Sequence, residues 1–400
     1  MTRARRMLFV VEHGSGWTGG IYYVRNLIDT LLHNPKVREW ELLVLCPDEH
    51  RDIFAPLVER GNVRLLRRSP LLGRLNFALM KAFRALRMDF PMDVALTALR
   101  HRVDAIFPVM GYPIFLLERR CVHWIPDFQH NKIPGFFSPR ERIRKDSRFE
   151  AIGKSRGKLI LSSQDAASHL SEFFPDSTVD VFVIPFISDI EEWAERITPE
   201  LERDVLAKFG LLQDGHPVPY LYVPNQFWMH KNHITAFRGF AEHRRRHPDS
   251  HLTLVCTGNN QDYRHVRFFE DLQRELAVQE LGDSVRILSF LERQEQVAIL
   301  KRCRALLQPS LFEGWGTGVQ EAKRFARPLL LSDLPIHREQ GSERSFFFSP
   351  TDPIALADAI DALEEANLPD PPEHEIRGRY FQDAEGYAKD AHLLIEAPSP

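Results

Sequence analysis

The stretch that decides the fold is residues 305–333, ALLQPSLFEGWGTGVQEAKRFARPLLLSD. It begins and ends with short apolar runs, at 305–310 and 328–333, and an amphipathic segment that starts near Thr317 lies between them. Short, continuous apolar runs that alternate with helical segments are typical of buried parallel strands covered by helices on both faces. The stretch therefore predicts a strand, a glycine-rich loop, a helix and a second strand of a parallel α/β sheet.

The same alternation continues along the whole chain in two series of apolar runs. The first series is 7–12, 41–46, 103–109, 121–125, 158–163 and 179–186; the second is 219–223, 251–258, 285–290, 305–310 and 328–333. Because 400 residues are too many for one ordinary core, we predict two doubly wound, Rossmann-like parallel-sheet domains that face a central cleft. The expected parts are a first domain at 1–190, a linker at 191–218, a second domain at 219–372 and a helical tail at 373–400 that packs back on the first domain.

Charge and cysteine content argue against several classes of protein. The net charge of -3 gives no whole-chain attraction to nucleic acid. The four cysteines form no CxxC motif or close pair, so neither a disulfide framework nor a zinc site is expected. No apolar stretch approaches the roughly 18 residues of a membrane-spanning helix, and the N-terminal apolar run is shorter than the core of a signal peptide. We therefore expect a cytoplasmic protein that binds no nucleic acid.

Glycines and carboxylates in the loop after residues 305–310 predict a binding site. Gly314, Gly316 and Gly318 let backbone N–H groups approach a ligand closely, and the helix start offers unpaired N–H groups and a partial positive charge that suit a phosphate. Glu313 precedes the turn and Glu321 lies in the first helical turns, so their carboxylates can accept hydrogen bonds from a sugar and a ribose. In the alternative interpretation, Glu321 only stabilises the helix start.

The segment from Glu313 to Glu321, EGWGTGVQE, resembles the E-x7-E signature of retaining glycosyltransferases, particularly family 4 of the GT-B fold. The resemblance implies that Glu313 binds hydroxyl groups of the donor sugar and that Glu321 binds the ribose. It also implies that the amides of Gly316, Thr317 and Gly318 meet the sugar and the phosphate. The first domain would then be the acceptor side and the second domain the nucleotide-sugar side.

The segment after the strand at 219–223, PNQFWMHKNHITAFRGF, is expected to meet the diphosphate. In family 4 this place usually reads Gly-Arg-x-x-x-x-Lys. Lys231 matches the lysine, whereas Asn225 and Gln226 stand where the Gly-Arg pair is expected, so either amide would be a neutral hydrogen-bond donor. A solvated lysine at a helix start is the alternative interpretation. The base pocket should involve the loop after the strand at 285–290, namely Leu291–Arg293.

The first domain opens with a second glycine-rich loop, HGSGWTGGIYYVRNL. Gly14, Gly16 and Gly19 match the dinucleotide fingerprint G-x-G-x-x-G, which makes an NAD- or FAD-dependent oxidoreductase the rival hypothesis. A glycine-rich first loop is also normal in family 4, and there it faces the nucleotide-sugar donor. The resemblance therefore implies a donor-binding role for Gly19 and Gly20.

The segment CVHWIPDFQHNKIPGFFSPRER resembles a block in a bacterial subgroup of family 4, in which an apolar strand precedes Asp-Phe-Gln-His. His123 is our first candidate for a first-domain group that touches the sugar or the β-phosphate, and Asp127 and His130 follow. In the alternative interpretation, Asp127 caps the local backbone. His337, after the strand at 328–333, is a candidate of the second domain for either a site residue or a structural one.

The stretch from Gly61 to Met88 contains seven lysines or arginines and no acid. Its part LLGRLNFALMKAFRALRM can form a basic amphipathic helix, which suits an anionic membrane surface. We offer peripheral contact with the inner face of the membrane as a hypothesis; an ordinary surface helix is the alternative.

Together these features predict a hexosyltransferase with His123 and Glu313 as catalytic candidates, and the resemblance to family 4 implies retention of the anomeric configuration. It would use a GDP- or UDP-sugar and a saccharide or lipid-linked acceptor, in the synthesis of cell-surface polysaccharide or glycolipid. No cofactor is expected, and the reaction should be independent of metal because no Asp-x-Asp stands where a metal-bridged donor would need it. The alternatives are the oxidoreductase, a nucleotide-sugar epimerase and a non-catalytic nucleotide-sugar-binding protein.

Overall fold

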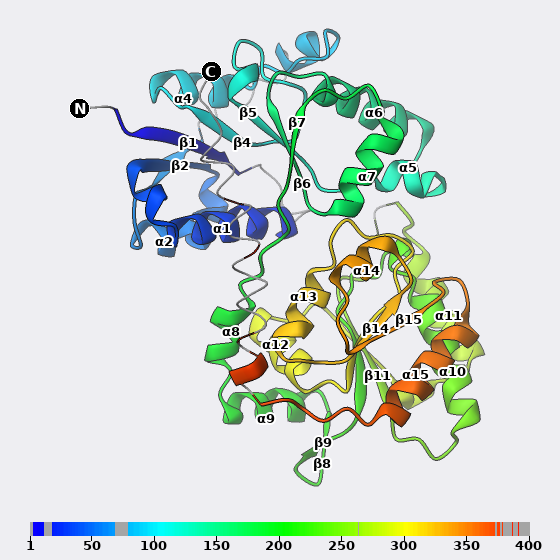
Figure 1. Cartoon of the computed structure of the whole chain (residues 1–400). Coiled ribbons are helices and arrows are strands. Elements are labelled where there is room, and N and C mark those ends of the chain that lie inside the picture. Colours follow the sequence, from blue (N-terminus) through cyan, green and yellow to red (C-terminus); the bar gives the residue numbers. More distant parts are fainter. Residues whose placement is uncertain are drawn as a thin grey trace. The chain divides into compact units, whose positions relative to one another are not determined.

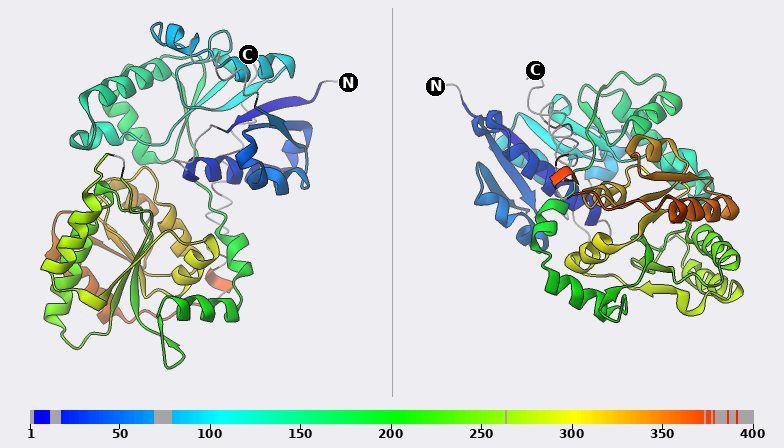
Figure 2. Two further views of the ribbon diagram at one scale, coloured as in Figure 1. Left: turned by 180° about the vertical axis from the view of Figure 1, so that it is seen from behind. Right: turned by 60° about the horizontal axis from the view of Figure 1, so that its bottom comes forward.

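A computed structural model of the chain describes residues 3–11, 18–68, 79–262, 264–372, 374–376, 378, 386 and 391. The chain divides into two compact units. The first unit is Met1–Ile187 together with Asp383–Pro400, and the second is Ser188–Gln382. Each unit contains one parallel sheet with helices on both of its faces (Figures 1 and 2).

The sheet of the first unit has seven parallel strands in the order β3-β2-β1-β4-β5-β6-β7. The strands are β1 (Arg5–Val10), β2 (Trp40–Cys46), β3 (Val63–Arg67), β4 (Ala105–Val109), β5 (Cys121–Ile125), β6 (Lys158–Leu161) and β7 (Asp180–Val183). The helices are α1 (Thr18–Leu32), α2 (Arg51–Val58), α4 (Met92–Arg100), α5 (Gln129–Lys132), α6 (Pro139–Gly153) and α7 (Gln164–Phe173). In β1, Met7 and Phe9 pack with α1 and α2, whereas Leu8 and Val10 pack with α4 on the other face. Both faces of the strand are buried, which explains why its sequence is continuously apolar.

The sheet of the second unit has six parallel strands in the order β12-β11-β10-β13-β14-β15. The strands are β10 (Tyr220–Val223), β11 (Thr253–Thr257), β12 (Val285–Leu288), β13 (Ala305–Gln308), β14 (Leu329–Ser332) and β15 (Ser345–Phe348). The helices are α8 (Ile190–Arg196), α9 (Pro199–Lys208), α10 (His233–Arg246), α11 (Phe268–Val278), α12 (Arg293–Arg302), α13 (Thr317–Arg324), α14 (Pro335–Gln340) and α15 (Pro353–Ala366). A small hairpin pairs β8 (Leu212–Gln213) with β9 (His216–Pro217).

Two cores lie on opposite faces of the second sheet. One core joins the sheet to α8, α9, α12 and α13, and the other joins it to α10, α11 and α15. Local signals fix where several helices begin: Thr198 caps α9 and Asp352 caps α15, and a proline follows each cap at the first helical position. The predicted fold class, two doubly wound α/β domains with parallel sheets, is confirmed.

The segment 191–218, which we expected to be a linker, folds as part of the second unit. It forms α8, α9 and the small hairpin, and Ile197, Leu206 and Leu211 are buried in the core of that unit. In the tail, the first unit takes in the residues from Asp383 onward, and Ala391 is buried in its core. Of the described residues, none belongs to a helix that is both long enough and apolar enough to cross a bilayer.

Candidate functional site

The order of strands in the second sheet reverses between β10 and β13, which makes this place a topological switch point. Asn225, Gln226 and Lys231 follow β10, and Glu313 follows β13. In open parallel α/β sheets, ligands bind outside the carboxyl ends of the strands at such a point. The topology therefore brings together candidate residues that lie 82 positions apart in the chain.

Lys231 and Glu313 form a buried ion pair at this switch point. The Lys231 Nζ donates to Oε1 and Oε2 of Glu313 at 2.7 and 2.9 Å, and the two side chains are only 16% and 6% exposed. Burial alone would raise the pKa of Glu313, but the charge of Lys231 and hydrogen bonds from Lys231 and Ser310 hold that pKa at about 2. Glu313 is therefore an ionised acceptor at neutral pH and not a proton donor.

Two residues that the sequence analysis did not single out fix the Glu313 carboxylate. Gln308, the last residue of β13, donates to Glu313 Oε1 at 2.6 Å, and the Ser310 hydroxyl donates to the same oxygen at 2.6 Å. Gln308 also accepts a hydrogen bond from Asn225 at 3.1 Å. Gln308 could have been recognised from the sequence, since it is a glutamine at the carboxyl end of an otherwise apolar strand. A buried amide there needs polar partners.

Asn225 and Gln226 use their amides to hold the loop after β10. Asn225 is buried and exchanges hydrogen bonds with Gln308 in both directions. The Oε1 atom of Gln226 accepts a hydrogen bond from the backbone N–H of Asn259 at 2.8 Å. These contacts position the loop that leads to Lys231.

His337, on α14, belongs to the supporting structure of the same strand ends. Its Nδ1 lies 2.7 Å from the Ser332 carbonyl, and the Ser332 hydroxyl donates to the Ser310 carbonyl at 2.7 Å. The ring is fully buried, and burial lowers the pKa of His337. A neutral imidazole that donates from Nδ1 therefore holds the segment that carries Ser310.

The glycine-rich loop is fixed by Gln340. The Gly316 N–H donates to Gln340 Oε1 at 3.1 Å, and Gln340 Nε2 donates back to the Gly316 carbonyl at 3.2 Å. Gly316 precedes α13, in which Thr317 is the first residue and Gly318 the second. A Cβ atom at Gly316 would come within 2.8 Å of Gln340 Oε1, whereas a Cβ atom at Gly318 would come no closer than 3.4 Å to any neighbour. A side chain would therefore clash at Gly316, whereas a Cβ atom at Gly318 would make only ordinary van der Waals contacts.

Glu321, on α13, is held by a second buried network. Arg293 donates to its two carboxylate oxygens at 3.1 and 2.6 Å, and the Ser188 hydroxyl donates to Oε1 at 2.7 Å. Arg293 also donates to Asp189 at 2.9 Å. Burial alone would lower the pKa of Arg293, but Glu321 and Asp189 raise it. A carboxylate has about four lone-pair sites, so these three hydrogen bonds leave about one for a ligand hydroxyl.

The pairing of Arg293 with Glu321 was not predicted from the sequence. Arg293, the last residue of the loop that was expected to form the base pocket, is the first residue of α12. The Leu291 side chain is buried in the core, so only its backbone is available to a nucleotide base. The position of Arg293, after a strand and at the start of a helix, was a signal that it could lie at a site. The sequence alone did not indicate its partner.

In the first unit, His123 is fully buried in β5. Its Nδ1 lies 3.0 Å from the carbonyl of Val109, the last residue of the neighbouring strand β4. The Nε2 atom is buried and has no hydrogen-bond partner among the described residues. Burial lowers the pKa of His123 to about 4. The ring is therefore neutral, donates from Nδ1 and keeps a free acceptor lone pair on Nε2.

Asp127 and His130 have local roles in the described structure. The Asp127 carboxylate accepts the N–H of Gln129 at 2.9 Å, which is the backbone cap of the alternative interpretation. His130 is buried against Phe149, and its Nε2 lies 3.1 Å from Asp146. Burial lowers the pKa of His130 to about 4.

The glycine-rich loop of the first unit is described only in part. Gly19, which is exposed, and Gly20, which is buried, lie in the first turn of α1. Gly14 and Gly16 of the dinucleotide fingerprint lie outside the described residues.

Residues 213–379 match the family model for glycosyl transferases group 1. The matched region contains Lys231, Glu313 and Glu321. Among curated proteins, the O-antigen chain mannosyltransferase RfbU of Salmonella typhimurium is 26% identical over 163 residues, which cover 41% of this chain and 43% of that protein. The uncharacterized glycosyltransferase YqgM of Bacillus subtilis is 27% identical over 170 residues, 41% of each chain. The matches thus span less than half of either curated relative.

Solved structures are similar over nearly the whole chain. A glycosyltransferase from Rickettsia africae superposes with a TM-score of 0.67 at 13% identity, covering 99% of this chain and 100% of that one. Anabaena Alr3699/HepE, in complex with UDP and glucose, superposes with a TM-score of 0.59 at 15% identity, covering 98% of this chain and 96% of that one. At these identities the similarity shows the GT-B type of fold.

Proposed function

We propose that this chain is a glycosyltransferase that moves a hexosyl group from a nucleotide diphosphate sugar to a saccharide or lipid-linked acceptor. The observation that carries the proposal is the buried Lys231–Glu313 pair at the switch point of the second sheet, within the segment that matches glycosyl transferases group 1. An ionised carboxylate beside a lysine offers an acceptor for sugar hydroxyls next to a cation for phosphate. An oxidoreductase that uses the loop at Gly14–Gly19 gains no support from this matched segment.

The chemical task is to stabilise a departing nucleotide diphosphate. Lys231 gives two of its three N–H groups to Glu313, and its partial exposure leaves the third for a phosphate oxygen. The start of α13, at Thr317 and Gly318, adds backbone N–H groups and a partial positive charge. Fixed positive potential of this kind lowers the barrier by stabilising charge that develops on the leaving group.

We propose retention of the anomeric configuration and membership of family 4 from the E-x7-E resemblance. Glu313 and Glu321 would act as binding groups. The pKa of Glu313 is about 2 and Glu321 is fastened by Arg293, so neither is suited to be the general acid of a glycosidase pair. His123 would contribute the acceptor lone pair of Nε2 from the first unit. With Lys231 and α13 to neutralise the diphosphate, we propose a metal-independent reaction.

The product would be a cell-surface polysaccharide or glycolipid, made in the cytoplasm from a GDP- or UDP-sugar. Support comes from the RfbU relative, whose name gives it as an O-antigen chain mannosyltransferase, and from the similar HepE structure, which holds UDP. RfbU and HepE are proteins to which this chain is similar. The sugar and the nucleotide base of its own donor are therefore part of the proposal.

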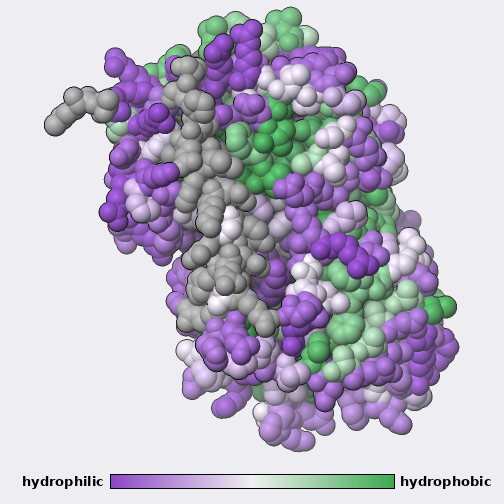
Figure 3. Space-filling view, in the orientation of Figure 1, coloured by the Kyte–Doolittle hydropathy of each residue, from purple (hydrophilic) through white to green (hydrophobic). Residues whose placement is uncertain are grey.

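Contact with the inner face of the membrane is a further part of the proposal. In the described part of the Gly61 to Met88 stretch, Lys81, Arg84, Arg87 and Leu86 are exposed. Arg84 lies 3.5 Å from Asp89, and Arg87 pairs with another acid at 2.8 Å, so part of the basic charge is already neutralised. Hydrophobic surface gathers at the top of the view in Figure 3, over the light-blue segment of Figure 1. Binding to vesicles that contain anionic lipid, and its loss when Lys81 and Arg84 become Glu, tests this contact.

The experiment that tests the function is a thermal-shift and calorimetry panel with UDP, GDP, ADP, dTDP, CMP, NAD and FAD. A ligand that binds only the folded state raises the apparent stability. We expect one nucleoside diphosphate to stabilise the protein and Glu321→Ala or Glu321→Gln to remove the effect. Glu270→Ala, which changes an exposed residue of α11, is the matched control and should keep it.

Turnover of the corresponding nucleotide sugar then separates an enzyme from a non-catalytic binding protein. Stabilisation by NAD or FAD that persists in the Glu321 variants would show that the transferase proposal is wrong. It would also direct attention to the loop at Gly14–Gly19.

A further inference from the structure

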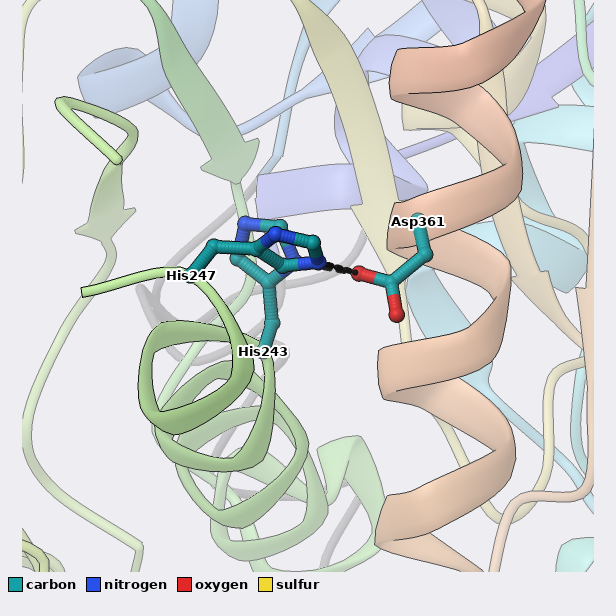
Figure 4. A group of neighbouring side chains, drawn as sticks. All are labelled: His243, His247 and Asp361. Carbon is teal, nitrogen blue, oxygen red and sulfur yellow. Dashed lines mark hydrogen bonds and ion pairs between the residues drawn. The ribbon is translucent and has the colours of Figure 1, made fainter. Parts of the chain in front are cut away.

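Three side chains that commonly bind metals meet between α10 and α15 in the second unit (Figure 4). His243 lies in the last turn of α10, His247 follows as its C-cap, and Asp361 lies on α15. His243 Nδ1 is 2.6 Å, and His247 Nε2 is 3.1 Å, from the same oxygen, Asp361 Oδ1. The three candidate ligand atoms all lie within 4.8 Å of one another.

The sequence explains why these side chains converge. A spacing of four residues places His243 and His247 on the same face of α10. Gly239, one turn earlier, lets α15 come close, because a Cβ atom there would lie 2.7 Å from the Leu356 side chain. The two helices therefore approach closely enough for a short aspartate side chain to reach both imidazoles.

We propose that His243, His247 and Asp361 form a binding site for a divalent cation of the Zn²⁺ class. Two imidazole nitrogens and one carboxylate oxygen are a ligand set that Zn²⁺ accepts, with a fourth position left for water. Bonds of about 2.1 Å at a tetrahedral angle place neighbouring ligand atoms roughly 3.4 Å apart. The separations of 2.6 and 3.1 Å would need only a small expansion to admit the ion.

The surroundings of the three side chains also suit a metal ion. Arg246 donates to the other carboxylate oxygen, Asp361 Oδ2, at 2.9 Å, which orients the carboxylate and leaves Oδ1 for the ion. His243 is only 3% exposed, whereas the His247 side chain is 52% exposed. One side of the group is therefore rigid and the other is open to solvent, which gives the ion an entry path.

The proposed ion would stabilise the fold and would take no part in sugar transfer. His243 is twelve positions beyond Lys231, about 15 Å along α10 from its first turn. The ion would fasten the end of α10 to α15. Direct pairing of His243, His247 and Arg246 with Asp361 is the competing explanation, and it predicts no dependence on metal.

The test uses the untagged full-length protein, treated with chelator and titrated with Co²⁺, whose visible absorption reports tetrahedral nitrogen and oxygen ligation. We expect one Co²⁺ per chain, displaced by Zn²⁺. The melting temperature should rise by roughly 5–10 °C at a free Zn²⁺ concentration about a hundred times the Kd. His247→Gln and Asp361→Asn should each abolish the absorption bands and the rise in melting temperature.

Two control variants separate this site from other histidines and from the Arg246 ion pairs. Asp358→Asn removes another partner of Arg246 on α15, and His216→Gln removes an exposed histidine elsewhere in the unit. Both should bind Co²⁺ as the unchanged protein does. If the unchanged protein takes up no Co²⁺, or if His247→Gln and Asp361→Asn bind it equally well, the proposal is overturned. Melting in the presence of chelator establishes that each variant is folded.

Discussion

Replacing Lys231 by methionine should destabilise the second unit far more than the loss of an ordinary surface lysine. Methionine keeps the length of the side chain and removes the charge, so the Glu313 carboxylate would stay buried with hydrogen bonds from Gln308 and Ser310 but without a cation. A buried charge without its partner is costly, because the low-dielectric interior solvates it poorly.

Two considerations give the same size for this effect. Breaking a buried ion pair by removing one partner costs about 3–5 kcal/mol. Independently, the pKa of Glu313 is depressed from 4.5 to about 2, which corresponds to about 3 kcal/mol of stability at neutral pH. Because the folded-state pKa is the lower one, this contribution is present above pH 4.5 and is lost as the pH falls toward 2. The difference between the unchanged protein and Lys231→Met should therefore shrink on acidification.

Urea unfolding followed by tryptophan fluorescence measures the effect, with Trp193, Trp228 and Trp315 in the second unit and Trp17, Trp40 and Trp124 in the first. The two units need not unfold together, so the transition of the second unit is analysed by itself. The matched control is Arg238→Met, which removes a half-exposed cation from its pair with Glu275 and should cost about 1 kcal/mol or less. The double variant Lys231→Met/Glu313→Gln should recover part of the loss. A Lys231→Met variant no less stable than the Arg238→Met control, or no recovery in the double variant, would refute the reasoning.

Four further outcomes are expected. Glu313→Gln should free the lysine for phosphate and tighten the binding of the nucleoside diphosphate identified by the panel by roughly threefold to tenfold in calorimetry, while transfer is lost. Arg293→Lys keeps the charge but loses the bidentate contact, so nucleotide affinity should fall about tenfold or more. Gly316→Ala should lower the melting temperature because its Cβ meets Gln340, whereas Gly318→Ala should leave the melting temperature unchanged and weaken binding. His123 is buried in its neutral form, with a pKa of about 4 in the folded protein and 6.5 in the unfolded chain, so its burial lowers the free energy of unfolding as the pH falls below 6.5. His123→Gln should therefore reduce the loss of unfolding free energy between pH 7 and pH 5 by about 2 kcal/mol, measured by urea unfolding.

Most strands of the two sheets could be predicted because they are buried on both faces. β3 and β15 were missed, and both are edge strands. In β3 the sequence VRLLR contains an exposed arginine between buried and half-buried residues, so it resembles the basic helical pattern that follows it. β15 has only four residues and only its last is fully buried. An edge strand covers less of the core, and its apolar signal is correspondingly weaker.

The candidate site could be predicted only where its residues are local in sequence. The start of α13, with Gly316, Gly318 and Glu321, follows from a strand, glycines and an amphipathic segment in succession. The partners that hold these residues could not be predicted, because they come from distant segments. Ser188 is 133 positions from Glu321, and Gln340 is 24 positions from Gly316. Side-chain hydrogen bonds over such separations depend on how the helices pack, which no local pattern encodes.

The Lys231–Glu313 ion pair bears on the absence of the arginine that family 4 usually has where Asn225 and Gln226 stand in this chain. With Asn225 and Gln226 engaged in holding their loop, Lys231 is the charged residue that the loop after β10 presents to Glu313. Since Glu313 neutralises that lysine, a diphosphate must compete with the carboxylate for it. When a phosphate binds Lys231, the Glu313 carboxylate loses a hydrogen bond from that lysine. Glu313 then becomes a better acceptor for the hydroxyl groups of the sugar that is attached to the phosphate. A site of this kind would favour the complete nucleotide sugar over the bare nucleotide, and the tighter nucleotide binding expected of Glu313→Gln is the direct consequence. If that variant instead binds the nucleotide more weakly, Glu313 supports the lysine and does not compete for it.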